Sequence, residues 1–462
     1  MIPLDLSLFG TDPWWLVVIK VLVLFVVLLV WTIFNVWYER RLVGKMQHRL
    51  GPIMNGPFGL GQALADGAKL LVKEDFRPAS ADRILFTVAP LIAGTAAFTA
   101  WSVIPFGGEV EIFGVKTRLQ LTDLPISVLV ILAVASVGIY GFVLAGWSSN
   151  SPYSLLGALR SSAQMISYEL SMGLALVAVF LYSRSMSTSE IVEAQGQPFV
   201  LDLQLGGFRI HWDWGMQSWY FLLLLPSFVI YVISMVGETN RAPFDLPECE
   251  SELVSGYLTE YSGFRYATYF LAEYINMATV SAVATTLFLG GYHAPWPINA
   301  LIPAMDQGWW GPLWFMLKVQ LLISLFVWLR GTLPRFRYDQ FMTLGWKWLI
   351  PISLVWVMVI ATFRIARNLA WFSNPLVMGG TVVVILALFA IWWLLDREPE
   401  PPEPEAETTF DAFAGGYPVP PLPGQELTVT RRAKATVAGT AVSSTVDVAA
   451  DTQTEGEETP HE

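Results

Sequence analysis

Three glutamates interrupt apolar runs of the sequence that are otherwise long enough to cross a membrane: Glu169, Glu238 and Glu273. An ionisable side chain in the middle of a bilayer costs about 2.5–3.5 kcal/mol on insertion scales, so such residues are usually paired or functional. Carboxyl groups removed from water can hold and release a proton near neutral pH. The pattern predicts a proton relay. The alternative is a structural ion-pair network in which Lys318 neutralises one of the glutamates.

Further acids follow in the loop 237–265, at Glu248, Glu250 and Glu252. Asp245 stands three residues before Glu248, which is the pattern of a capped helix N-terminus, so we expect Asp245 to be structural. On a short helix Glu248 and Glu252 would share one side and Glu250 would lie on another. A solvated acidic helix explains the loop taken alone. Together with the glutamates within the spans, the loop predicts an acidic path into the bilayer.

A second polar loop, 38–83, contains an amphipathic segment. Its apolar stripe is formed by Leu60, Leu64, Ala68 and Leu71, and its polar stripe by Gln62, Asp66, Lys69 and Lys73. A helix with this pattern is expected to lie along the membrane surface. A basic interfacial anchor would explain it as well, but the glycines and prolines around it indicate a shaped connection.

The elements that must hold these acids are membrane helices, because 54% of the 462 residues are hydrophobic and only 14% are charged. We expect an all-α polytopic membrane protein with about nine spans and long cytoplasmic loops that carry short amphipathic helices. The expected spans are 14–36, 84–104, 125–147, 162–182, 217–236, 266–291, 309–329, 347–363 and 376–395.

Lysine and arginine are more than twice as frequent in the loops after odd-numbered spans as in the others, which predicts an outside N-terminus. The tail 396–462 is then inside. It holds 14 acidic and 4 basic residues and few aromatics, so we expect it to be disordered. A single cysteine and four scattered histidines give no metal site and no pattern for a cofactor bound by this chain.

Several motifs resemble one known family, the membrane subunit called subunit 1 or the H subunit of proton-pumping NADH:quinone oxidoreductase, respiratory complex I. They are Glu39–Gly44, Ala65–Leu70, Ala145–Arg160, Ile166–Leu170, Gly237–Glu248 and Arg337–Gln340. The resemblance implies an eight-helix core over residues 1–365, followed by an extra span at 376–395. It also implies that loops 38–83 and 237–265 border a quinone chamber.

The resemblance implies site residues as well. A proton or charge relay would run through Glu169, Glu238, Glu273, Glu248, Glu250, Glu252 and Asp66. Glu39, Arg40 and Arg241 would line or shape the quinone tunnel. The relay would couple quinone reduction to proton translocation.

The same resemblance implies that the substrate is ubiquinone or menaquinone, with NADH, FMN and iron–sulfur clusters held by partner subunits. Expected partners are the hydrophilic-arm subunits around the terminal iron–sulfur cluster, the small and antiporter-like membrane subunits, and the lipid bilayer, with no nucleic acid. The expected location is the bacterial plasma (inner) membrane.

Three alternatives remain open. Related subunits anchor membrane-bound hydrogenases and ferredoxin- or deazaflavin-linked dehydrogenases, and this sequence does not reveal its electron donor. A free-standing secondary transporter would also place acids within spans, although it has less need of long inside loops. A purely structural anchor would tolerate neutralisation of Glu238 or Glu273.

Overall fold

The computed structural model describes residues 12–205, 208–245, 253–306 and 308–368, with four isolated positions at 380, 387, 389 and 390. The loop acids Glu248, Glu250 and Glu252 lie outside the described residues, as does the tail 396–462. Apart from the four isolated positions, so does the expected span 376–395.

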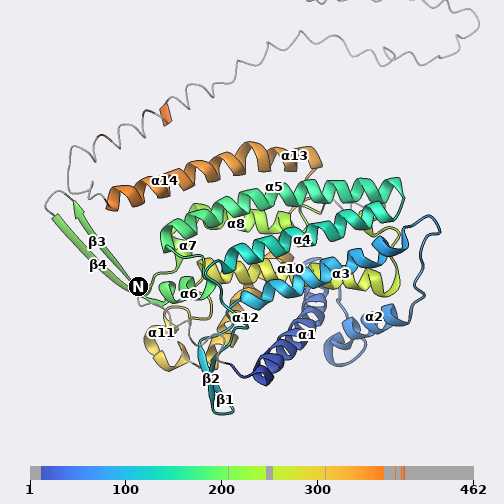
Figure 1. Ribbon diagram of the computed structural model, residues 1–462, viewed down its shortest axis with the longest axis horizontal. Coiled ribbons are helices and arrows are strands. Elements are labelled where there is room, and N and C mark those ends of the chain that lie inside the picture. Colours follow the sequence, from blue (N-terminus) through green and yellow to red (C-terminus); the bar gives the residue numbers. More distant parts are fainter. Residues whose placement is uncertain are drawn as a thin grey trace, which may run out of the picture. The chain divides into compact units, whose positions relative to one another are not determined.

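Helices make up most of the described structure (Figure 1). Six helical stretches in this part of the chain are long and apolar enough to cross a membrane, which fits a polytopic membrane protein. They are α1 (Trp14–Met46), α3 with its 3₁₀ extension (Arg83–Val103), α4 (Ser127–Ser148), α5 (Pro152–Ser183), α12 (Trp310–Thr332) and the stretch Tyr338–Ile365. The total of nine spans and the orientation in the membrane remain predictions.

The last of the six stretches is not a uniform α-helix. It begins as α13 (Tyr338–Thr343), passes through a π-helical segment (Leu344–Leu349) and continues as α14 (Ile350–Asn368). The expected span 347–363 is therefore only the central part of a longer helix.

The expected span 217–236 is not one helix. A strand ends at Gln217, a single turn follows as α7 (Tyr220–Leu223), and the chain leaves helical geometry at Leu224 before α8 (Leu225–Glu238). Pro226 explains the break, since proline has no backbone N–H and is accommodated in the first turn of a new helix. At 14 residues, α8 is about 21 Å long, which is shorter than the hydrocarbon core.

α10 (Gly263–Phe288) is the central helix of the bundle. It packs against α1, α3, α8 and α12, and its half from Met277 to Phe288 is buried throughout. A helix that is covered on all sides by other helices needs little lipid-facing apolar surface. It therefore has room for polar residues such as Glu273 in its first half.

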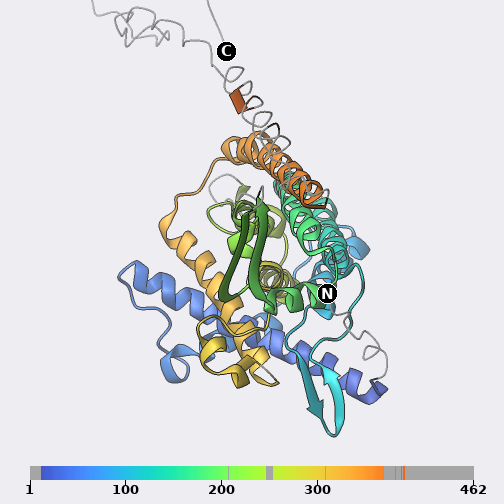
Figure 2. The same ribbon diagram turned by 90° about the vertical axis from the view of Figure 1, so that its left-hand side faces the viewer.

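Two β-hairpins, which the sequence did not predict, interrupt the helices (Figure 2). β1 (Glu109–Ile112) pairs antiparallel with β2 (Val115–Arg118), and β3 (Pro198–Leu205) with β4 (Phe208–Gln217). The expectation of an all-α chain is thus too simple, although the protein is mostly helical.

The described structure also has three short α-helices, α2 (Gly61–Val72), α6 (Thr188–Gly196) and α11 (Ile298–Leu301). Short 3₁₀ helices lie at Pro57–Gly59, Gly256–Leu258 and Pro303–Asp306. α2 coincides with the predicted amphipathic segment and contacts α1 and α10. The bundle has two ends. We call the end where α1, α8 and α12 finish and α10 begins the acidic end. The opposite end, where α8 begins and α10 finishes beside the hairpins, is the hairpin end.

Candidate functional site

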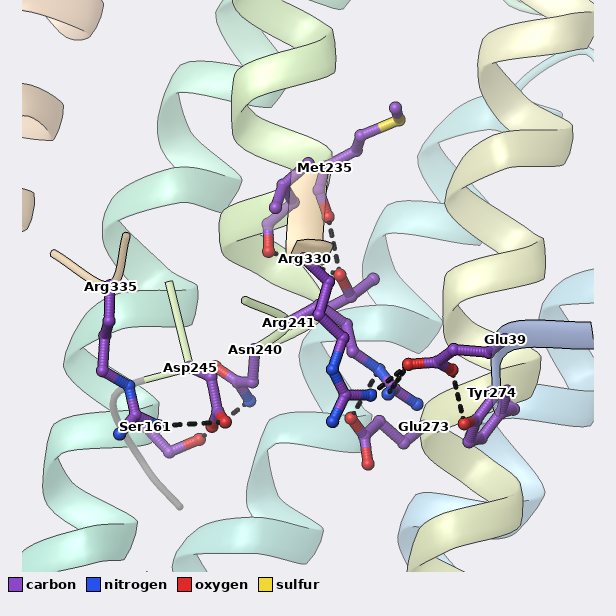
Figure 3. A network of polar contacts seen from close by, with 12 residues as sticks. Glu39, Ser161, Met235, Asn240, Arg241, Asp245, Glu273, Tyr274, Arg330 and Arg335 are labelled. Atoms are coloured by element: carbon purple, nitrogen blue, oxygen red, sulfur yellow. Dashed lines mark hydrogen bonds and ion pairs between the residues drawn. The ribbon is translucent and has the colours of Figure 1, made fainter. Parts of the chain in front are cut away.

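A network of charged side chains joins three helices and one loop at the acidic end (Figure 3). Glu39 comes from α1, Glu273 and Tyr274 from α10, and Arg330 from α12, while Arg241 follows α8. Glu39 and Arg330 stand in the last two turns of their helices, whereas Glu273 lies in the first half of α10. The alternation of helix directions brings these positions, far apart in the sequence, to one place.

Arg241 lies between two carboxylates. Its Nε is 2.8 Å from Glu273 Oε1, and its Nη1 donates a hydrogen bond to Glu39 Oε1 at 3.4 Å. Its guanidinium also lies over the Tyr274 ring, 4.2 Å from the centroid, as a cation–π contact. Glu39 accepts two more hydrogen bonds, one from the Tyr274 hydroxyl at 2.6 Å and one from Arg330.

This network is balanced in charge, because two arginines face two glutamates. Burial alone lowers the pKa of the Arg241 guanidinium, but Glu273, Tyr274 and Glu39 raise that pKa well above its ordinary value. Arg241 is therefore a fixed positive charge at every physiological pH. A buried pair of this kind costs desolvation, which only good geometry and several hydrogen bonds repay.

Glu238 has a different environment, although it lies only three residues before Arg241. Its side chain is 1% exposed, and neither carboxylate oxygen has a hydrogen-bond partner among the described residues. It lines a small cavity of about 20 Å³ together with Tyr231, Asn276 and Thr279. That volume is enough for about one water molecule. The rest of its lining is mostly apolar, with Val128, Ile131 and Met172 among the residues. The Glu238 carboxyl can therefore change its protonation state without breaking an ion pair among the described residues.

Glu169 is half-buried on α5 and accepts a hydrogen bond from the Ser136 hydroxyl of α4. It is close enough to Glu238 for the two carboxylates to interact electrostatically. The two glutamates form a pair distinct from the arginine network, and neither makes an ion pair with a cationic side chain in the described part of the chain.

The remaining expected residues lie elsewhere. Asp66 on α2 forms an ion pair with Arg40 of α1 at 2.5 Å, and both side chains are partly exposed. Asp245 forms an ion pair with Arg335 at 3.0 Å, while the residues that it was expected to cap lie outside the described chain. Of the ten expected site residues, the structure joins Glu39 and Glu273 through Arg241, and it pairs Arg40 with Asp66 separately.

Two members of the network, Arg330 and Tyr274, were not predicted. Arg330 stands in the last turn of α12, where a basic residue ordinarily indicates only a cytoplasmic boundary or a favourable helix dipole. For Tyr274, the only feature of the sequence that could have indicated a role in the network is its position next to Glu273. Among the described residues, Lys318 forms no ion pair with a glutamate: it donates to backbone carbonyls at the hairpin end. The described residues contain no group of three or more His, Cys, Asp or Glu arranged to hold a metal.

Comparison with known proteins decides the family. The family model described as NADH dehydrogenase matches residues 19–361. The NADH-quinone oxidoreductase H subunit of Cutibacterium acnes is 59% identical over 449 residues, which cover 96% of this chain and 98% of the relative. The chain belongs to the family of NADH-quinone oxidoreductase H subunits. The H subunit of Streptomyces avermitilis is 53% identical over 462 residues, covering 98% of this chain and 97% of the relative.

Membership in this H-subunit family confirms the resemblance inferred from the motifs. It identifies the chain as a membrane subunit of an NADH-quinone oxidoreductase, a translocase complex, and implies other subunits of that complex as partners.

Proposed function

We propose that this chain forms part of the quinone chamber of the complex and relays the charge change of quinone reduction into the membrane arm. The observation that carries the proposal is the contrast at the acidic end. Glu238 is buried without a hydrogen-bond partner among the described residues, and it lies next in sequence to a loop whose Arg241 is tied to Glu39 and Glu273.

The reduction of quinone determines which charges this site has to balance. Reduction of a quinone to a quinol takes up two electrons and two protons, so negative charge develops in the chamber until protons arrive. Arg241 and Arg330 supply fixed positive charge beside that region, and Glu39 and Glu273 balance it while the chamber is at rest. New negative charge weakens these pairs and changes the field at Glu238.

The proposed relay continues from Glu238 to Glu169, since these two carboxyls interact electrostatically and, within the described structure, neither is held by an ion pair. Moving one charge against 100 mV costs about 2.3 kcal/mol. A change of two units in the pKa of a carboxyl corresponds to about 2.7 kcal/mol, so one such group is an adequate coupling element. Glu248, Glu250, Glu252 and Asp66 remain proposed members of the path.

The proposal includes the arrangement in the membrane. With the N-terminus outside, the acidic end faces the cytoplasm, where the hydrophilic arm holds NADH, FMN and the iron–sulfur clusters. The bundle would then cross the plasma membrane nine times, with Glu39, Arg40 and Arg241 shaping the tunnel for ubiquinone or menaquinone. The high identity to proteins named as H subunits of NADH-quinone oxidoreductase favours this over a hydrogenase anchor.

The test is Glu238→Gln in the assembled complex, measured in membrane vesicles as NADH:quinone activity and coupled proton movement, with assembly checked on a native gel. We expect a complex of normal abundance whose turnover or pumping collapses. Glu193→Gln is the matched control, since Glu193 forms an ion pair with Arg118 at 3.3 Å, away from the acidic end, and we expect full activity from it. Normal turnover and pumping in Glu238→Gln would make the acids structural and end the relay proposal.

A further inference from the structure

Lys318 is a buried lysine that the proposed relay does not use. It lies on α12 with a 6% exposed side chain, and its ammonium donates to three backbone carbonyls where α10 ends. The acceptors are the oxygens of Leu289 at 2.6 Å, Gly291 at 2.9 Å and His293 at 2.8 Å. All three hydrogens of an ammonium group therefore have an acceptor.

This geometry belongs to the charged form of lysine. A neutral amine has two N–H donors and one lone pair, and the lone pair would face a carbonyl oxygen at one of the three positions. The negative end of the α10 dipole also favours a cation at this point. The face of the Trp219 ring, 4.3 Å from Nζ, adds a cation–π contact. These contacts favour the ammonium form of Lys318 and hold its nitrogen in a fixed position.

Carboxylates near Lys318 are already engaged. Asp306 is the acid that acts on Lys318 electrostatically. However, its Oδ1 accepts a hydrogen bond from Ala294 N at 2.6 Å, and its Oδ2 lies 3.1 Å from His293 Nδ1. Among the described residues no carboxylate forms an ion pair with the Lys318 ammonium. The positive charge is consequently not cancelled by a partner in contact with it.

A layer of aromatic side chains separates this charge from the cavity at Glu238. Tyr231 lines that cavity, and its ring centroid is 5.6 Å from that of Phe288. Phe228 also packs against Phe288, with centroids 5.4 Å apart. Phe288 is fully buried and directly precedes Leu289, whose carbonyl binds Lys318. From the cavity toward the hairpin end, the order is carboxyl, aromatic layer, fixed cation.

We propose that Lys318 and this aromatic layer form an electrostatic barrier that keeps protons of the acidic end from leaving through the hairpin end. A hydronium ion that passes the apolar layer meets a positive charge in a medium of low dielectric, where repulsion is strong. Fixed positive groups exclude protons from other membrane pores by the same physics. The acidic end is thereby open to sideways transfer of charge and closed to transfer straight across this subunit.

The inference extends the proposed function, but its test does not depend on the relay. Passive proton leak is measured in vesicles that contain the assembled complex and no substrate, so no turnover takes part. The relay can fail its Glu238→Gln test while the barrier passes, and the reverse is equally possible.

The experiment compares three variants of Lys318 in that leak assay. Lys318→Met removes charge and donors, Lys318→Gln keeps donors without charge, and Lys318→Arg keeps charge and donors. We expect Lys318→Met and Lys318→Gln to raise the rate of passive proton entry about tenfold, and Lys318→Arg to stay near the wild-type rate. If the charge of Lys318 forms the barrier, the proton leak rates of Lys318→Gln and Lys318→Arg must differ.

The matched control is Lys20→Met. Lys20 is also largely buried and bonded to Asp12 at 2.6 Å and to Thr117 at 2.5 Å, but its charge is paired with a carboxylate. We expect vesicles with the Lys20→Met complex to leak protons at the wild-type rate. Equal leak rates in wild type, Lys318→Gln and Lys318→Met would overturn the barrier, as would a leak that Lys318→Arg shares, because capping of α10 would then be the only role of Lys318.

A measurement on the wild-type complex covers the case in which the Lys318 variants do not assemble. Leu289 N and Gly291 N both donate to Thr285 O within the closed end of α10. Hydrogen–deuterium exchange of these amides is expected to take minutes to hours, since a sealed end admits little water. Exchange within seconds would reveal a hydrated path beside Lys318 and contradict the barrier.

Discussion

Arg241 and Glu238 are three residues apart, yet one is held by two carboxylates and the other has no hydrogen-bond partner among the described residues. The chain turns out of α8 between them, so Arg241 reaches α1 and α10 (Figure 3). Glu238 stays buried within the bundle. Three variants test whether this division between a structural network and a responsive carboxyl is real.

The first variant is Arg241→Met. It leaves Glu39 and Glu273 in a buried site without their shared guanidinium, and breaking a buried pair by removing one partner costs about 3–5 kcal/mol. We expect a marked loss of assembled complex on a native gel. Arg265→Met is the control, because its ion pair with Asp75 at 3.3 Å is more exposed and such pairs contribute about 1 kcal/mol or less. Equal abundance of the two variants would show that the network does not stabilise the fold.

The second variant, Glu238→Met, separates stability from function. Since Glu238 has no ion pair or hydrogen bond among the described residues, an apolar side chain of similar volume removes a desolvation penalty and breaks no contact. We expect normal assembly and an unchanged or higher melting temperature of the detergent-solubilised complex, with loss of turnover or pumping. Glu39→Met, which strips the carboxylate from Arg241 and Arg330, should lower the melting temperature instead. A destabilised Glu238→Met complex would mean that the carboxyl has a structural partner.

The third variant, Gly237→Ala, tests the packing next to Glu238. A Cβ at Gly237 would lie 2.7 Å from Tyr168 Cδ1, which forces the ring or the end of α8 to move. Overpacking of this kind costs about 1–3 kcal/mol. Gly345→Ala is the control, because its Cβ would meet the same ring at an ordinary 3.4 Å. We expect reduced quinone reductase activity only in Gly237→Ala, restored by adding Tyr168→Leu. Failure of that second change to restore activity would place the strain elsewhere.

The sequence allowed good prediction of what depends on local pattern. Long apolar runs predicted the membrane helices, and the two stripes of the 60–73 segment predicted α2, because hydrophobic periodicity is a property of neighbouring residues. The motifs around Glu39 and Arg241 predicted the family, which the comparisons confirmed.

Long-range partnerships were harder to predict. The alternative to the relay paired Lys318 with a glutamate because its type and depth fitted that role, but in the described structure its ammonium binds backbone carbonyls at the hairpin end. Arg330 was missed because a basic residue at the end of a span is ordinary. The hairpins were missed because their strands are held by hydrogen bonds between backbone groups of paired strands. The pattern of hydrophobic residues along the sequence does not reveal which segments pair.

The contact between Glu39 and Arg330 also bears on how the protein is made, because the two residues are 291 positions apart. Translation at about 5–20 residues per second leaves the first helix waiting roughly 15–60 s before α12 emerges. Over the first 202 residues after Glu39 the carboxylate has neither of its arginines, and until α12 emerges it still lacks Arg330. The nascent first helix therefore carries an incompletely neutralised charge. Completion of the network is therefore a late step of biogenesis, and it marks the moment at which the bundle can close.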